Sequence, residues 1–135
     1  MEIDPRDGYR TVSAVEDIER KLQAIIRGLP AHVRPVIVAD WRTTAVLTPP
    51  VAERVVAMMT ATNTRIERSA ILHAGEASTS VLQLVRLIKE TSVPYRRLFT
   101  EPALLQLWLE EILTREESER LREFLMSSRR ASQRQ

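Results

Sequence analysis

The chain has 135 residues, of which 44% are hydrophobic, and it carries 20 basic residues against 18 acidic ones. This length fits one domain with a core of its own. Cysteine is absent, which excludes disulfides and thiolate metal sites, and no apolar run approaches the roughly 20 residues of a transmembrane helix. Since the first residues are acidic and do not resemble a signal peptide, we expect a cytoplasmic protein.

The basic excess comes from one end of the chain. The last ten residues contain Arg129, Arg130 and Arg134 and no acid. Without these three, 17 basic residues face 18 acidic ones, so the rest of the chain is close to neutral. We therefore expect residues 127–135 to form a basic, disordered tail, and we expect no specific nucleic-acid partner.

The N-terminal part combines an irregular segment with a helix. We expect residues 1–12 to be irregular, with 9–12 as a candidate edge strand. Ser13 and Glu16 match the Ser-x-x-Glu capping box, which predicts that a helix starts there. Gly28 supplies the stop signal. The buried stripe of this helix has apolar residues at helical spacing: Ile18, Leu22, Ile25, Ile26 and Leu29.

The next elements are a strand, a helix and a second strand. The run 36–41 is apolar, as in a strand that is buried on both faces. Thr48 is a candidate N-cap with Pro49 at the first helical position, and the helix that they start is expected to end near Asn63. A second β-rich run follows at 68–73.

The remaining pattern is helix, strand, helix, helix. We predict a helix over 78–91 and a third strand over 95–99. Thr100 is the candidate cap of the fourth helix, which is apolar over more than half of its circumference. Thr114 and Glu117 form a second capping box and start a last helix.

Strands that alternate with helices of this length indicate parallel βαβ units. The predicted fold class is therefore α/β, with a small, mostly parallel sheet of three or four strands, helices packed on it and a C-terminal helical extension. We expect a single α/β domain over residues 13–126. In open α/β sheets, binding crevices lie at the carboxyl ends of the strands.

Three short segments carry a family resemblance. Asp40-Trp41-Arg42 ends the first strand, Arg96 to Phe99 forms the third, and Trp108-Leu109 follows in the fourth helix. Together they resemble STAS-like proteins, the relatives of anti-sigma-factor antagonists that include the SpoIIAA-like group. The resemblance covers about 35–113. It implies a small sheet backed by helices on one face and a non-enzymatic role in bacterial protein–protein signalling.

The chain departs from that family at two places. The family usually begins with a β-hairpin before its first helix, and 12 residues leave little room for one. The bacterial antagonists also carry a phosphorylatable Asp-Ser-Ser-Gly, where this chain reads Leu47-Thr48-Pro49-Pro50. Thr48 has the only hydroxyl at that place. It is the candidate phospho-site, and the alternative is a plain helix cap.

The sequence contains no complete catalytic motif. His73 and Asp40 end two predicted strands, and if those strands are neighbours the two side chains could meet as part of a hydrolase site. No Gly-x-Ser-x-Gly elbow accompanies them. The alternative is a strand-end histidine bonded to the backbone. Ligand spacing for a metal and glycine-rich phosphate loops are also lacking, so we expect no enzyme activity, metal or cofactor.

Four charged residues are candidate contact sites. Asp40 and Arg42 lie on the same side of an extended strand, where they either pair with each other or leave Arg42 for an anionic partner group. Arg96 and Arg97 alternate on the third strand, so one of them points to solvent and can meet a helix carboxylate or a partner.

The apolar fourth helix leads to the functional prediction. We expect a non-catalytic protein–protein interaction module in bacterial regulation that forms a homodimer and binds protein partners. The interface candidates are the apolar residues of the last two helices, with Trp108 as the central one: Leu105, Trp108, Leu109, Ile112 and Phe124. The alternative for these residues is that the last helix folds back and covers them.

A second functional class remains open. A carrier or sensor of a small apolar, lipid-like ligand would need a cavity between the helices and the sheet. Met58 and Met59 are adaptable residues that would suit its lining. Two adjacent methionines also occur commonly as plain core residues.

Overall fold

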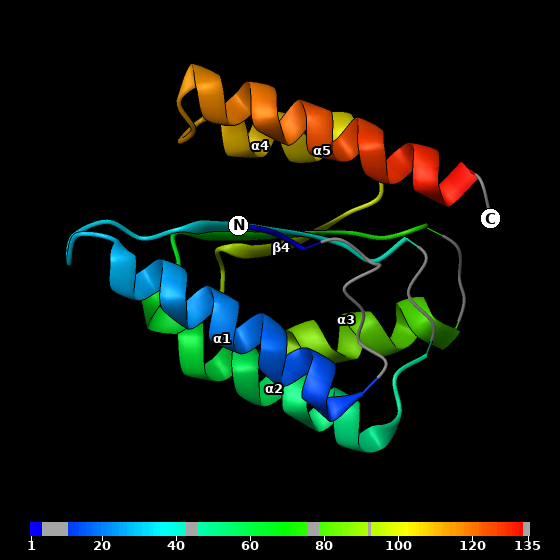
Figure 1. The fold of residues 1–135 in the computed structure, drawn as a ribbon. Helices are drawn as coiled ribbons and strands as arrows, with labels where there is room; N and C mark the ends of the chain where they lie inside the picture. The colour runs from blue at the N-terminus through cyan, green and yellow to red at the C-terminus, as the bar shows by residue number, and fades with distance from the viewer. Residues whose placement is uncertain (4–10, 43–45, 76–78, 92, 134–135) are drawn as a thin grey trace.

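The computed structural model describes residues 1–3, 11–42, 46–75, 79–91 and 93–133 (Figure 1). Strands and helices alternate along this part of the chain, which confirms the α/β class. The elements are β1 (Glu2–Ile3), α1 (Val12–Gly28), β2 (Val36–Asp40), α2 (Pro49–Thr62), the short 3₁₀ helix η2 (Asn63–Arg65), β3 (Arg68–Leu72), α3 (Thr79–Thr91), β4 (Arg96–Phe99), α4 (Pro102–Glu110) and α5 (Arg115–Gln133).

The described strands form one parallel sheet in the order β1-β2-β3-β4, which is also their order along the chain. Right-handed crossovers between successive strands that advance in one direction place every connecting helix on the same face. Figure 1 shows this arrangement, with α1, α2 and α3 together below the sheet.

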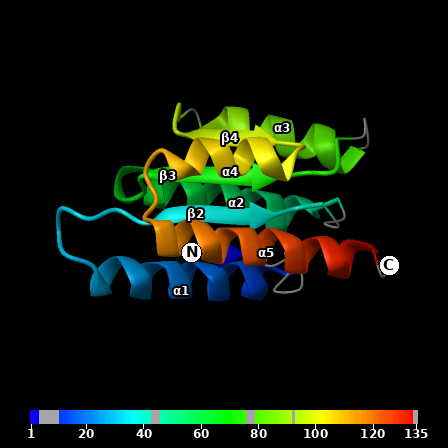
Figure 2. The same cartoon turned by 90° about the horizontal axis from the view of Figure 1, so that it is seen from above.

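The helical extension covers the opposite face. Figures 1 and 2 show α4 over the β3–β4 side of the sheet and α5 beside it over the β1–β2 side. This differs from the one-face arrangement that the STAS-like resemblance implied. The physical reason lies in β2 and β3, because their apolar residues alternate between a core under α1–α3 and a second core under α4 and α5.

The start of α1 and the edge strand both differ from the prediction. The N-cap is Thr11, whose extended backbone lets its hydroxyl oxygen accept a hydrogen bond from the Ala14 N–H at 3.0 Å. The capping box at Ser13 is therefore wrong, since Ser13 already lies inside the helix. The edge strand is Glu2–Ile3, whereas Val12 of the expected strand 9–12 is helical and residues 9 and 10 lie outside the described part.

Other boundaries are partly as predicted. The Thr114 capping box is confirmed, since the Glu117 N–H donates to the Thr114 hydroxyl oxygen at 3.2 Å and the Thr114 N–H donates to Glu117 Oε1 at 2.9 Å. Glu101 stands at the N-cap of α4 in place of Thr100. The helix α5 continues to Gln133, so residues 127–133 are helical and not the disordered tail that the sequence predicted.

A buried arginine connects the two last strands to the ends of two helices. Arg96 on β4 is only 5% exposed. Its Nη1 donates to Asn63 Oδ1 at 2.9 Å and its Nε donates to the Ser69 hydroxyl oxygen at 3.3 Å. Asn63 also donates from Nδ2 to the Thr91 carbonyl at 3.3 Å, which adds the last residue of α3 to the network.

The position of Arg96 explains how a buried cation is tolerated. Among the described residues Arg96 forms no ion pair with a carboxylate. It lies instead near the carboxyl ends of α2 and α3, where the helix dipoles carry partial negative charge. Burial lowers the pKa of the Arg96 guanidinium below its usual range, although an arginine remains charged at neutral pH.

We expect Arg96→Lys to lower the free energy of unfolding by about 2 kcal/mol, because an ammonium cannot reach Asn63 and Ser69 together and leaves buried polar groups unpaired. Urea denaturation measures the loss. Arg97→Lys is the matched control, since Arg97 is the next residue of β4 and is exposed, and it should cost less than about 1 kcal/mol. Equal losses in the two variants would contradict this account of the network.

Candidate functional site

Asp40 and Arg42 form a closed pair at the carboxyl end of β2. The Asp40 side chain is buried, and its Oδ1 accepts hydrogen bonds from the Arg42 backbone N–H at 3.0 Å and from Arg42 Nε at 3.1 Å. Its Oδ2 accepts from Arg42 Nη2 at 2.9 Å. This two-pronged geometry engages the carboxylate and one edge of the guanidinium. The pair therefore stabilises the strand end, as one of the two alternatives predicted.

Asp40 and His73 do not form the pair that the hydrolase alternative required, since each has another partner. Asp40 is in register with Leu72, and both follow the alternation that directs Val38 toward α4 and α5. His73 comes one residue later, so its side chain belongs to the opposite side of the sheet. The hydrolase hypothesis is wrong in this respect, because adjacent parallel strands bring together residues in register and not residues one step apart.

His73 takes part in a tight turn after β3. Its backbone N–H donates to the Phe99 carbonyl at 2.9 Å, and its Nδ1 accepts a hydrogen bond from the Gly75 N–H at 3.2 Å. Gly75 has a φ of +79°, and a Cβ there would lie 3.2 Å from Thr100 Cγ2. Burial lowers the pKa of His73 below its ordinary value near 6.5. Its Nδ1 is therefore engaged in a local hydrogen bond to the backbone.

Trp108 is a residue of α4 whose ring contacts aromatic and cationic side chains of β3 and β4. The guanidinium carbons of Arg68 and Arg97 lie 4.8 and 4.9 Å from its ring centroid, and the Phe99 ring lies 5.5 Å away. The Trp108 carbonyl accepts a hydrogen bond from Arg68 Nη1 at 2.5 Å. Trp108 is half-buried, so part of its ring remains at the surface beside the exposed Arg97.

The structure divides the other interface candidates into buried and accessible ones. Leu105 and Leu109 lie on the inner face of α4 and are fully buried against the sheet and α5. They therefore present no surface to a second molecule. The alternative that the last helix folds back is the one observed, since α4 and α5 are in contact. Ile112 and Phe124 are half-buried. The sequence analysis did not include the two exposed leucines of α4, Leu104 and Leu107, among the interface candidates. Helical spacing could have identified them, because it places them on a different face of the helix from Leu105.

The space between the helices and the sheet is small. Met58 and Met59 do line a cavity there, together with Ile71 and Arg96, but its volume is about 30 Å³. One or two water molecules fill such a volume. In this conformation the cavity cannot hold a lipid-like ligand, whose sites measure about 300–1,000 Å³.

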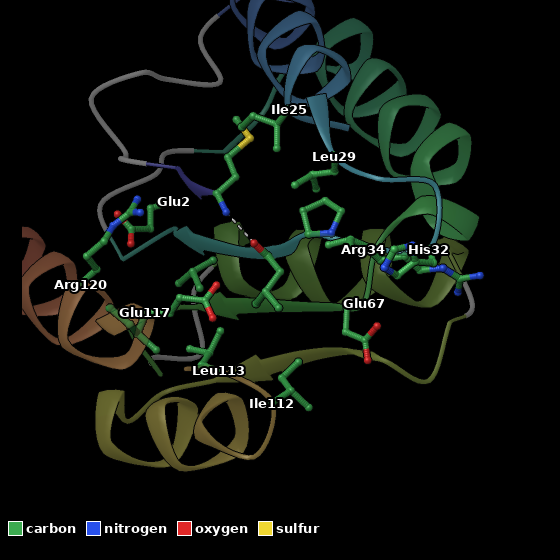
Figure 3. A pocket seen from close by; sticks show the side chains of 16 residues that line it. Glu2, Ile25, Leu29, His32, Arg34, Glu67, Ile112, Leu113, Glu117 and Arg120 are labelled. Atoms are coloured by element: carbon green, nitrogen blue, oxygen red, sulfur yellow. Dashed lines mark hydrogen bonds between the residues drawn. The ribbon is translucent and has the colours of Figure 1, made fainter. Parts of the chain in front are cut away.

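A hollow at the surface was not predicted from the sequence. Figure 3 shows it between the end of α1, the turn that joins α4 to α5, and the amino end of β2. Its volume is about 660 Å³. A second hollow of about 420 Å³ lies on the α1 side of β1. Both are formed by segments far apart in the chain, which no local pattern relates. Residues that line them include Met1, Glu2 and Ile25, which are common to both.

Three further expectations concern modification, metals and membranes. Thr48 stands at the N-cap of α2 but makes no side-chain capping bond, so its hydroxyl is not used by the helix. Within the described ranges no cluster of three or more histidine and acidic side chains has the geometry to hold a metal ion. None of the helices found in those ranges combines the length and apolarity that crossing a membrane requires.

Comparison with protein-family models, with curated proteins and with solved structures finds no match for this chain.

We expect stability to fall as the pH is lowered through the His73 titration. The unfolded chain, with an ordinary histidine pKa near 6.5, binds a proton more readily than the folded state, whose pKa is lower. Stability is therefore lost from about pH 6.5 downward. The control is His73→Asn, whose Oδ1 can still accept from the Gly75 N–H. Chemical denaturation between about pH 7 and 5 should show the wild type losing stability relative to this variant; a constant difference would contradict the assignment.

Proposed function

We propose that this chain is a non-catalytic protein–protein interaction module that self-associates through the exposed flank of α4. The observation that carries the proposal is the exposure of two leucines one helical turn apart, Leu104 at 53% and Leu107 at 62%. They lie on the side of α4 that carries Trp108. We call Leu104, Leu107, Trp108 and Arg97 the α4 patch.

The composition of the α4 patch supports this proposal. Leucine, tryptophan and arginine together provide apolar area and a charged group that is already stacked on the ring. Trp and Arg are enriched among the residues that dominate binding energies at interfaces. The patch also lies beside β4, a sheet edge. A stable dimer buries about 800 Å² on each partner, so the patch would form the centre of a larger contact.

The chemistry at the carboxyl ends of the strands supports a role without catalysis. Asp40 is bonded to Arg42, and the Nδ1 of His73 is bonded to the Gly75 N–H. The two groups that the sequence offered for acid–base chemistry are thus engaged in local structure. A role in bacterial signalling of the STAS-like kind is part of this proposal, on the basis of the resemblance of the strand ends and of Trp108-Leu109.

We expect the double variant Leu104→Glu, Leu107→Glu to weaken self-association at least roughly tenfold, because it places four like charges across a two-fold contact. Light scattering coupled to size exclusion, over a series of protein concentrations, measures the dimer dissociation constant. The fold should be retained, since both side chains are exposed.

Leu82→Glu is the matched control, because Leu82 is 65% exposed on α3, on the other side of the sheet. It should leave the dissociation constant unchanged. A wild-type chain that stays monomeric at all concentrations, or a double variant that dimerises like the control, would show that the α4 patch is not a self-association surface.

A further inference from the structure

Among the described strands, β1 is an edge of the sheet. It is two residues long and pairs with β2, and no other described strand lies on its outer side. Met1 is turned toward β2, because its amino group donates to the Val36 carbonyl at 2.6 Å and its carbonyl accepts from the Val38 N–H at 2.8 Å. Backbone groups alternate in direction along a strand, so the N–H and C=O of Glu2 point away from the sheet.

Hollows lie on both sides of this open edge. The larger one, of about 660 Å³, reaches the turn between α4 and α5, and the smaller one, of about 420 Å³, lies along α1. Ile25 lines both and is 38% exposed. An interior strand of a parallel sheet needs such space on both faces for its side chains, because successive side chains point to opposite faces.

We propose that this edge is a docking site for an extended apolar segment of another polypeptide, which adds to the sheet as a strand next to β1. The Glu2 N–H and C=O bind its backbone, and the two hollows take its alternate side chains. Its length is about five residues, that of β2. Apolar residues form the larger share of both linings, among them Leu29, Val33 and Leu113 in the larger hollow and Ile18 and Ala24 in the smaller, and charged residues stand beside them. The segment therefore carries apolar side chains on both faces, as β2 itself does.

The arrangement of the helices selects a single strand over a second whole copy. Figure 2 shows α1 at the outermost position on this side and α5 over β1. A copy docked through its own β1 would bring its α1 or α5 against these helices. One strand needs only the 4.7–4.9 Å of a normal strand spacing.

The charges around the hollows also favour an uncharged segment. Three acidic side chains, Glu2, Glu67 and Glu117, stand against three basic ones, Lys21, Arg34 and Arg120, and the Met1 ammonium adds one positive charge. Because both signs are present in similar number, a strongly acidic or basic segment would gain little net attraction here. An apolar one gains from burial alone.

The test uses the full-length chain and a fluorescein-labelled peptide, KKTVIVITKK, with KKTEIEITKK as the control that has charges on one face. Anisotropy should show saturable binding of the first and at least roughly tenfold weaker binding of the second. Ile25→Asp and Val33→Asp, both at exposed positions of the hollows, should each weaken binding about as much. Leu82→Asp on α3 should not change it.

A second readout separates strand addition from contact through side chains alone. Bound peptide should slow hydrogen exchange of the Glu2 amide, because that N–H becomes hydrogen-bonded. The proposal is overturned if neither peptide binds, if the two bind equally, if the variants bind as wild type does, or if Glu2 exchange is unchanged. It is also overturned if Ile25→Asp dissociates a dimer, which would make a second copy the occupant. The α4 patch lies beside β4, at the opposite edge of the sheet from β1. The test of self-association through that patch therefore succeeds or fails independently of this one.

Discussion

The handedness of the strand connections is the constraint on which the rest of this structure depends. With four parallel strands in chain order, right-handed crossovers leave no choice about where α1, α2 and α3 lie. These three helices pack on one face of the sheet, and the opposite face has to be covered by other elements. The apolar residues on that second face, among them Val38, Ala70 and Leu72, are then covered by α4 and α5. The C-terminal helices are therefore part of the core and not an appendage. This explains why the face of α4 that carries Leu105 and Leu109 is apolar and why both residues are fully buried.

The same strand order affects where function can reside. Open α/β sheets bind ligands where the strand order reverses and two crossovers diverge. The order of the four described strands has no such reversal. The polar groups found there bind one another or the backbone, as Asp40 does with Arg42 and His73 with Gly75. Both proposals therefore concern contacts with macromolecules, at the outer flank of α4 and at the β1 edge.

Local patterns in the sequence predicted the elements better than the site. Periodicity located the helices and three strands, because it depends on residues a few positions apart. Of the predicted starts, the Thr114 capping box is confirmed, whereas Ser13 and Thr100 are not the caps of their helices. Side chains alternate between the two faces of a strand, which places Asp40 and His73 on opposite faces of the sheet. This conclusion requires the register of β2 and β3, which the sequence alone does not give. The network of Arg96 with Asn63 and Ser69 joins three elements through long-range contacts, so no spacing in the sequence signals it. The strand β1 has two residues, which are too few to show an alternating pattern. The hollows beside it are formed by several segments that are distant in the sequence, so no local pattern predicts them either.

The agreement between strand order and chain order has a consequence for how the molecule is made. Each strand pairs with the one synthesised just before it, so a chain that leaves the ribosome can assemble its sheet one βα unit at a time, with every new contact close in sequence. The face under α4 and α5 is the exception. Val38 is made early, whereas its cover at Leu121 and Leu125 emerges only near the end. For most of synthesis, one face of the sheet is thus covered by helices and the other exposes its apolar residues to solvent. Apolar surface that is exposed during synthesis favours aggregation, so we expect a chain truncated before α5 to be more prone to aggregate than the full chain.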